Sequence, residues 1–208
     1  MRSADLMLGK CGGDGLALRG ARARLSSRRM SRRPPCPSDP QPPYVATAPG
    51  EARITITDRA FAPGILLEIF SRGRTEVGAV ASFTGLARAE GGAAQLLELE
   101  AYPGFTDAAI TRFAEEAKSR FGLEDYRIVH RTGCIPAGEA IVFVATAAGH
   151  RRAAFEACDF LMDYLKSRAP FWKKQHGPDG SRWVEPTIQD HADAGRWDRA
   201  GLVMTSLG

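Results

Sequence analysis

Long apolar runs, metal-ligand spacings and the familiar catalytic motifs are all missing from these 208 residues. No stretch of 18 or more apolar residues occurs, so the sequence predicts no helix that crosses a membrane. The four histidines and four cysteines show no zinc-ligand spacing, and we therefore expect neither a metal nor another cofactor. The GxGxxG, GxxxxGK[ST], HExxH and GxSxG patterns are absent too, which argues against the enzyme classes that depend on them.

The low cysteine content bears on the cellular compartment. None of the four cysteines lies in a CxxC pair, and no apolar leader segment for secretion is present. Both observations favour a reducing, cytoplasmic location, in which we expect the thiols to be free. Cys158 stands among apolar residues, so we expect it to be a buried, inert thiol.

An excess of positive charge is confined to the N-terminal segment. Residues 1–50 hold nine Lys/Arg and three Asp/Glu, whereas residues 51–208 hold 19 basic and 21 acidic residues. The first segment is poor in large apolar residues, so we expect a disordered basic tail. Translation beginning at Met30 and a targeting segment are the alternatives. Residues 51–208 are expected to form a single domain, and their acidic balance gives no reason to expect nucleic acid as a partner.

Short strand patterns and two long helical patterns alternate along residues 51–208. Apolar stripes at helical spacing predict helices over 107–121 and 151–168, the first capped by Thr106 and ended by Gly122. A shorter helix is expected over 65–70 after Pro63, and a last, loosely packed one over 187–200. Strand patterns cover 53–57, 77–86, 96–102, 125–131, 141–145, 171–176 and 181–185, the last two forming a hairpin. This order predicts an α+β fold in which helices pack on a mostly antiparallel sheet with an added hairpin.

Positive side chains gather at the ends of these expected elements. His150, Arg151 and Arg152 stand where the strand over 141–145 leads into the second long helix. Backbone N–H groups at a helix N-terminus attract anions, so cations placed there favour an anion-binding site. A solvated loop with ordinary surface charge is the alternative interpretation.

A second group of cations follows at the other end of that helix. Lys166 lies in its last turn, and Lys173 and Lys174 begin the expected hairpin. A lysine that is close to other cations and to aromatic side chains can have a lowered pKa and act as a nucleophile or base. The alternative is an ordinary lysine favoured by the helix dipole, with Phe171 and Trp172 in the core.

Several longer segments together resemble one known family. They are SFTG (82–85), LELEAYPG (97–104), VHRTG (129–133), GHRRAAF (149–155), FLMDYLKSRAPFWKK (160–174) and RWVE (182–185). In this order they closely resemble the family of the large, catalytic subunit of molybdopterin synthase, over roughly residues 53–200. The resemblance implies an α/β hammerhead-like fold with added antiparallel strands.

The resemblance also implies a reaction and its partners. Members of the family convert cyclic pyranopterin monophosphate to molybdopterin by adding two dithiolene sulfurs. The sulfur comes from the C-terminal thiocarboxylate of a small ubiquitin-like subunit. The implied assembly is a heterotetramer, with a central homodimer of large subunits and one small subunit at each end.

Site residues are implied where the motifs match. The lysines of DYLK and FWK fall on Lys166 and Lys173, which are implied to be catalytic. The HR pair of the substrate pocket falls on His150 and Arg151. The implied substrate-binding residues, expected to face one anion-binding pocket, are Leu86, Ala87, Arg88, His150, Arg151, Lys166, Lys173, Lys174 and Gln175.

Three positions depart from the family pattern. Gln175 stands where the family often has Glu, Leu86 where it often has Lys, and Ala101 where His is common. If Gln175 replaces a charged partner, Lys173 is expected to titrate differently. Two other hypotheses stay open beside the sulfurtransferase: a scaffold that binds a ubiquitin-like partner without catalysis, and a nucleic-acid binder that uses the basic tail.

Overall fold

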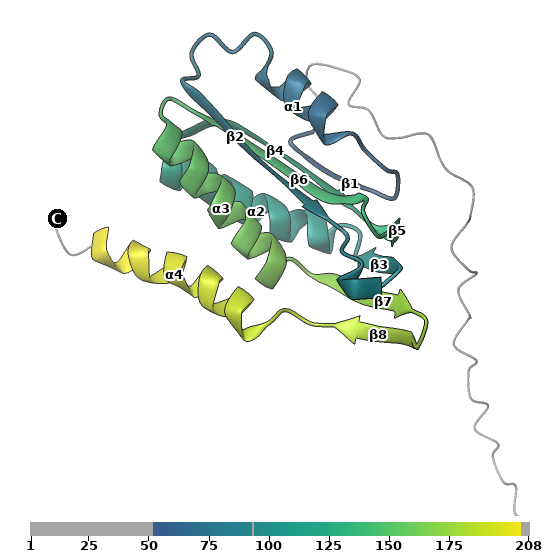
Figure 1. Ribbon diagram of the computed structural model, residues 1–208. Coiled ribbons are helices and arrows are strands. Elements are labelled where there is room, and N and C mark those ends of the chain that lie inside the picture. Colours follow the sequence, from purple (N-terminus) through teal and green to yellow (C-terminus); the bar gives the residue numbers. More distant parts are fainter. Residues whose placement is uncertain (1–51, 93, 205–208) are drawn as a thin grey trace, which may run out of the picture. The chain divides into compact units, whose positions relative to one another are not determined.

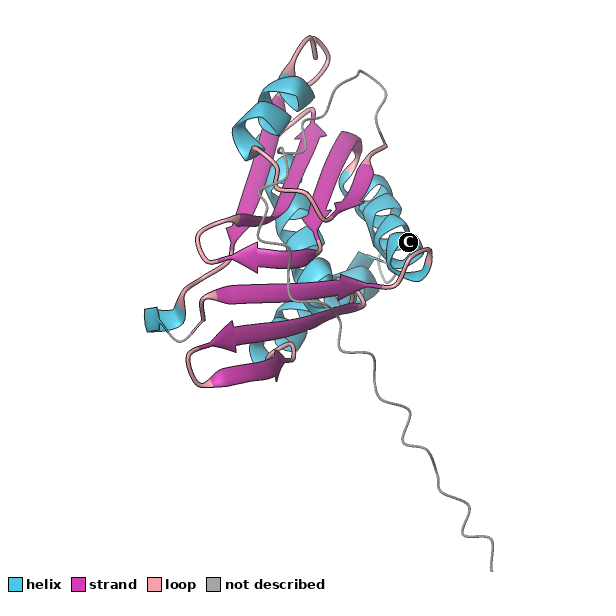
Figure 2. Cartoon of the chain, turned by 90° about the vertical axis from the view of Figure 1, so that its right-hand side faces the viewer, coloured by secondary structure: helices cyan, strands magenta, loops and turns pink. Residues whose placement is uncertain are grey.

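The computed structural model describes residues 52–92 and 94–204, which form four helices, eight strands and a short turn of 3-10 helix (Figure 1). The expected tail over residues 1–50, including Met30, lies outside the described residues. Within residues 52–92 and 94–204, no helix is both long and apolar enough to cross a membrane. The strands form two sheets, which Figure 2 shows in magenta.

The first sheet holds the main core of the molecule. Its strand order is β1 (Ile54–Thr57), β4 (Leu123–Arg131), β6 (Ala140–Ala148) and β2 (Ala79–Leu86). β1 runs parallel to β4 and the other pairs are antiparallel, which confirms a mostly antiparallel sheet. The inner strand β6 is buried on both faces from Val142 to Ala148, as the apolar run over 141–145 predicts.

Helices cover both faces of this sheet (Figure 1). On one side, α2 (Phe105–Phe121) and α3 (Arg151–Ser167) pack against alternate β6 residues, including Val142 and Val144. On the other, α1 (Pro63–Ser71) covers Phe143 and Ala145. Each long helix presents one apolar stripe to the sheet, because residues three or four positions apart share a helix face. The fold class predicted from the sequence is confirmed.

The second sheet is antiparallel throughout and carries the predicted hairpin. Its order is β5 (Gly133–Pro136), β3 (Leu96–Ala101), β7 (Phe171–Gly177) and β8 (Gly180–Val184). Gly177 pairs with Gly180, so only two residues form the hairpin turn. The sequence does not predict the strand β5, because its four residues are too few for an alternating pattern and include a glycine and a proline.

The start of α2 differs from the expected cap. The helix begins at Phe105, and the Asp107 side chain accepts a hydrogen bond from the Gly104 N–H at 3.2 Å. Thr106 is fully buried, and the prediction that it is the N-cap is wrong. Its hydroxyl accepts from the backbone N–H of Tyr102 at 2.9 Å and donates to the carbonyl of Pro170 at 3.1 Å. Thr106 thereby fixes the segment that leads from α3 into β7.

The last helix is longer and more firmly attached than the sequence suggests. α4 (Ile188–Met204) packs along α3, where Ala194 is buried and Trp197 contacts the rings of Phe121 and Phe160 edge-on. Its polar side contributes as well. The carboxylate of Asp163 accepts hydrogen bonds from Arg196 at 2.7 Å and from the Trp197 indole at 2.7 Å.

We expect Asp163→Asn to loosen α4 and to lower the free energy of unfolding by about 1–3 kcal/mol, the usual cost of leaving buried polar partners unsatisfied. Asp159→Asn is the matched control. Asp159 binds the same Arg196 from one turn earlier, at 2.6 Å, but its side chain is 54% exposed against 14% for Asp163. Urea unfolding of both variants measures the effect. Equal losses of unfolding free energy in the two variants would contradict the conclusion that Asp163 holds α4 against α3.

The interior also contains the one cysteine for which the sequence predicts burial. Cys158 lies in the main core, facing the sheet from α3. Burial raises the pKa of its thiol to about 12, which keeps it protonated near neutral pH. The prediction that Cys158 is buried is confirmed. The expectation of free thiols is wrong for Cys134, which is disulfide-bonded.

Candidate active site

A small pocket lies where the two sheets meet. β2 and β6 contribute Leu86 and Ile141 from the first sheet, and β3 and β7 contribute walls from the second. The lining residues are Leu86, Ala87, Arg88, Glu90, Ala94, Leu96, Leu97, Ala137, Ile141, Lys173 and Gln175. Five of these residues, namely Leu86, Ala87, Arg88, Lys173 and Gln175, belong to the pocket that the resemblance implied.

Strand alternation explains which side chains of β7 reach the pocket. Successive residues of a strand point to opposite faces, so Lys173 and Gln175 share one face and Lys174 lies on the other. The Lys174 ammonium lies 5.4 Å from the ring centre of Trp183, on the exposed face of the hairpin. The structure therefore does not bring Lys174 into the pocket.

The turn between α3 and β7 places Lys166 next to Lys173. α3 ends at Ser167, and β7 begins at Phe171, whose ring stacks on the buried ring of His130 at 3.9 Å. Lys166 in the last turn remains 66% exposed and forms an ion pair of 2.7 Å with Asp190, at the start of α4. Trp172 is 52% exposed, so the alternative that placed it in the core is wrong.

Asp190 is held from both sides. One carboxylate oxygen pairs with Lys166, and the other accepts from the backbone N–H and the hydroxyl of Thr187, both at 2.8 Å. Burial alone would raise the pKa of Asp190, but these hydrogen bonds outweigh it and lower the pKa to about 2. A fixed negative charge therefore faces the ammonium of Lys166.

Lys173 is the lysine of the pocket whose pKa is lowered. Burial is the main cause, because removing an ammonium from water disfavours its charged form. The positive charges of Lys166 and Arg88 act in the same direction, whereas those of Glu90 and Asp190 oppose it. The structure thus groups three cations and two carboxylates around one position, an arrangement that suits general acid–base work and anion binding.

The sequence does not predict two charged residues of this site, Glu90 and Asp190. Glu90 precedes Gly91 and Gly92 in a turn that has no strand or helix pattern. Asp190 falls in the helix that was expected to pack loosely. Only the capping pattern of Thr187 with Asp190, three residues apart, is a usable signal.

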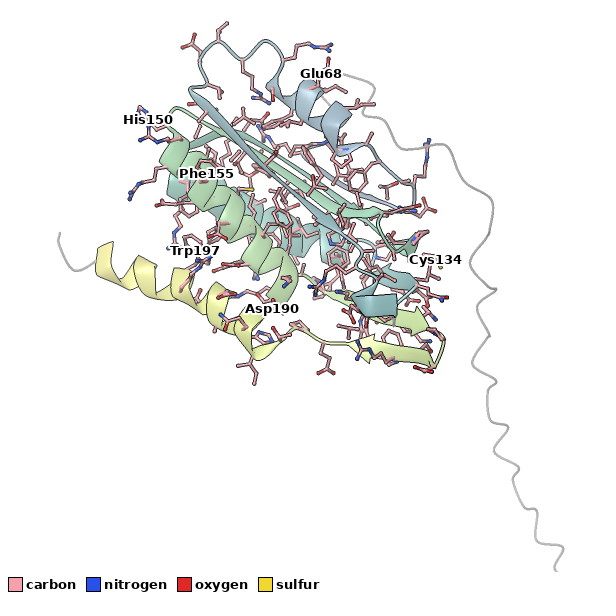
Figure 3. All side chains as sticks on the ribbon, viewed as in Figure 1. Glu68, Cys134, His150, Phe155, Asp190 and Trp197 are labelled. Carbon is pink, nitrogen blue, oxygen red and sulfur yellow. The ribbon has the colours of Figure 1, made fainter. Side chains whose placement is uncertain are left out.

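His150 and Arg151 lie at the opposite end of α3. His150 is the N-cap residue and Arg151 the first residue of the helix, whereas Lys166 is in its last turn. Sixteen residues at 1.5 Å per residue separate His150 from Lys166 by about 24 Å. Figure 3 shows His150 and Asp190 at opposite ends of α3. One chain therefore does not bring the two groups of cations into one pocket.

No set of three or more His, Cys, Asp or Glu side chains within residues 52–92 and 94–204 is arranged to hold a metal ion. The pocket instead offers ammonium and guanidinium groups, which bind phosphates and carboxylates through charge-assisted hydrogen bonds. A mixed α/β domain with such a pocket between two sheets has the arrangement expected of an enzyme active site.

Comparisons with known proteins identify the family. A model described as MoaE protein matches residues 56–168. A molybdopterin synthase catalytic subunit of Caulobacter vibrioides is 69% identical over 146 residues, which cover 70% of this chain and 97% of that protein. The chain belongs to the MoaE protein family.

Solved structures agree in fold. The molybdopterin biosynthesis MoaE protein from Burkholderia ambifaria aligns with a TM-score of 0.60 and 41% identity, over 70% of this chain and 97% of that one. A chain of the complex of subunits 1 and 2 of molybdopterin-converting factor from Helicobacter pylori aligns with a TM-score of 0.57, over 64% of this chain and 90% of that one. At 21% identity, the second likeness shows the fold alone.

Proposed function

We propose that this enzyme acts as a molybdopterin synthase catalytic subunit and inserts the two dithiolene sulfurs into cyclic pyranopterin monophosphate. The observation that carries the proposal is the pocket itself, in which Lys173 and Arg88 face inward and Lys166 adjoins them. Both the phosphate of the pterin and the thiocarboxylate that donates sulfur are anions, so both need positive charge. Family membership supports the same assignment.

Lys166, Lys173 and Arg88 have different roles in the proposed reaction. Each sulfur forms a C–S bond to a side-chain carbon of the pterin as a C–O bond at that carbon breaks, and the oxygen leaves as water or as the phosphate ester oxygen. Water hydrolyses the bond between the sulfur and the partner's carbonyl carbon, which ends as a carboxylate. Lys166, exposed and held by Asp190, stabilises negative charge that develops on the carbonyl oxygen or moves the proton. Lys173, whose pKa burial lowers, releases its proton more readily than an exposed lysine and is the second group able to exchange a proton. Arg88 clamps the phosphate.

The sulfur donor is a small ubiquitin-like subunit. Relatives are named as a catalytic subunit, which implies a second kind of chain in the assembly. Its C-terminal tail has to reach the pocket beside Lys166, because the thiocarboxylate must touch the pterin. We place the complex in the cytoplasm, as a heterotetramer built on a homodimer of this chain.

The homodimer gives His150 and Arg151 a route to the substrate. Within one chain they lie about 24 Å from Lys166, too far to share its ligand. A two-fold dimer brings the same surface of each copy together, so the N-terminal end of α3 can face the pocket of the partner. In this arrangement, the pair contributes phosphate contacts in trans.

Mixing inactive variants tests this sharing of sites. Lys166→Ala and Arg151→Ala chains, each weakly active alone, are expected to recover activity when they are refolded together. Random pairing leaves about a quarter of the sites with both residues intact. The matched control mixes Lys166→Ala with Arg88→Ala, whose affected residues belong to one chain's pocket, and should show no recovery. Recovery in both mixtures, or in neither, would refute a site shared in this way.

The proposed reaction is tested by mixing the purified chain with a thiocarboxylated partner and the pyranopterin precursor, and measuring dithiolene product. Product formation that depends on all three components is expected. A chain that binds the partner but forms no product would support the scaffold hypothesis instead.

A further inference from the structure

Glu90 is the only carboxylate among the residues that line the pocket in the described part of the chain. Its backbone is unusual as well. With φ at 48°, Glu90 is the one non-glycine residue within 52–92 and 94–204 that has a positive φ. A non-glycine residue in this region is strained, and it persists only where its surroundings hold it there. The side-chain contacts of Glu90 identify what holds it.

A closed ring of hydrogen bonds fixes the Glu90 carboxylate. One oxygen accepts from the Gln175 amide at 2.9 Å, and the other accepts from the Arg182 guanidinium at 2.9 Å. Arg182 in turn donates to the Gln175 carbonyl oxygen at 3.0 Å. Gln175 and Arg182 are directly opposite each other in the β7–β8 ladder, so the hairpin presents both groups to Glu90 in a set geometry.

This ring joins two walls of the pocket. Glu90 follows Arg88 in the segment after β2, whereas Gln175 lies two residues beyond Lys173 on β7, on the same strand face. The carboxylate therefore holds the segment that carries Arg88 against the strand that carries Lys173. Its charge acts on both cations: the hydrogen bond from Gln175, then the charges of Arg182, Arg88 and Lys173, lower the pKa of Glu90.

We propose that Glu90 is a positioning residue of the pocket: locked by Gln175 and Arg182, its carboxylate keeps the neighbouring Lys173 ammonium charged and limits the excess positive charge that an anionic ligand meets. This inference rests on the proposed function for the role of Lys173. The charged groups that act on Lys173 are Lys166 from α3, Arg88 and Glu90 from the segment after β2, and Asp190 from α4. Buried His130 from β4 is its titratable neighbour.

The test measures Lys173 directly, without turnover. The full chain is labelled with an amine-acetylating reagent across a pH series, and mass spectrometry reports the extent of labelling at Lys173. In Glu90→Gln, which is isosteric but uncharged, the midpoint of Lys173 labelling should shift to lower pH. In Gln175→Glu, which adds a carboxylate at the same place, it should shift to higher pH. The two opposite shifts cannot both arise from loosened packing.

Exchanging the two side chains gives a rescue. In the double variant Glu90→Gln with Gln175→Glu, the carboxylate and the amide exchange places and can still hydrogen-bond to each other. The midpoint of Lys173 labelling should therefore return toward that of the parent. Glu68→Gln, which removes an exposed carboxylate that pairs with Arg72 on α1, should leave the midpoint unchanged. An unchanged midpoint in both single variants, or no return in the exchange, would overturn the proposal.

A turnover assay separates this proposal from the proposed function. With thiocarboxylated partner and pterin precursor, Glu90→Gln should lower the KM for the pterin at a pH where Lys173 is still charged, because the pocket has lost a negative charge. Its kcat should decline at a lower pH than that of the parent, because Lys173 loses its proton more readily. A loss in kcat with a raised KM would indicate mere loosening and would count against the proposal. If the parent forms no dithiolene, the proposed function fails, whereas the labelling shifts still decide the role of Glu90.

Discussion

Replacing Lys166 by alanine should reduce the rate of dithiolene formation by about 10²–10³, the usual cost of removing one preorganised electrostatic donor from an active site. Lys166 is an exposed cation whose charge acts on Lys173, and its ammonium lies 2.7 Å from the carboxylate of Asp190. Its loss removes positive charge where the thiocarboxylate carbonyl is expected to arrive. Lys166→Arg should restore the rate only in part, because a guanidinium differs in shape and remains charged.

Single-turnover kinetics with a preformed complex provide the measurement. Lys118→Ala is a matched control, because Lys118 also lies in the last turn of a 17-residue helix, but on α2. It should react at the parent rate. If Lys166→Ala stays bound to the small subunit and still reacts at near the parent rate, Lys166 is not the catalytic group.

The regular elements of this fold can be predicted because each has a strong periodic signal. The apolar run over 141–145 in β6 and the apolar stripe of α3 are both evident in the amino-acid sequence. Thr106 cannot be placed in this way. Its local pattern fits a helix cap, but its hydroxyl instead donates a hydrogen bond to the carbonyl of Pro170, 64 residues away. A local signal cannot reveal a competing partner that is distant in sequence.

The site illustrates the same limit. Motifs point to Lys173 and Arg88, and the structure brings them to one pocket. Glu90 and Asp190, which set the charge of that pocket, come from a turn and from a helix end without any motif. The separation of His150 from Lys166, in contrast, follows from helical rise alone. The helix predicted over 151–168 already implies about 24 Å between them.

His130 should make the protein sensitive to mild acid. Its ring is buried and stacks on the ring of Phe171. Burial lowers the pKa of His130 to about 4, and the nearby charge of Lys173 acts in the same direction, while a hydrogen bond to the Arg131 carbonyl opposes it. In the unfolded chain the same side chain has a pKa near 6.5. The unfolded state therefore binds a proton at a higher pH than the folded state does.

The difference between the folded and unfolded pKa of His130 determines how the unfolding free energy changes with pH. The contribution of His130 is fully present above pH 6.5 and is lost as the pH falls from 6.5 toward 4, because only the unfolded chain is protonated in that window. The expected loss is about 3 kcal/mol of unfolding free energy, from roughly 1.4 kcal/mol for each pH unit. Asp190, with a pKa of about 2, contributes to acid sensitivity only below this window.

Urea unfolding at a series of pH values between 7 and 4 measures the loss. His130→Gln cannot be protonated, so its unfolding free energy should fall much less across the window, whatever its absolute stability. His191→Gln is the matched control, because His191 is exposed on α4 and its replacement should leave the pH dependence of the parent intact. Parallel curves for the parent and His130→Gln would mean that His130 accepts a proton in the folded state as readily as in the unfolded one. The ring that stacks between β4 and β7 would then not be a neutral, desolvated group.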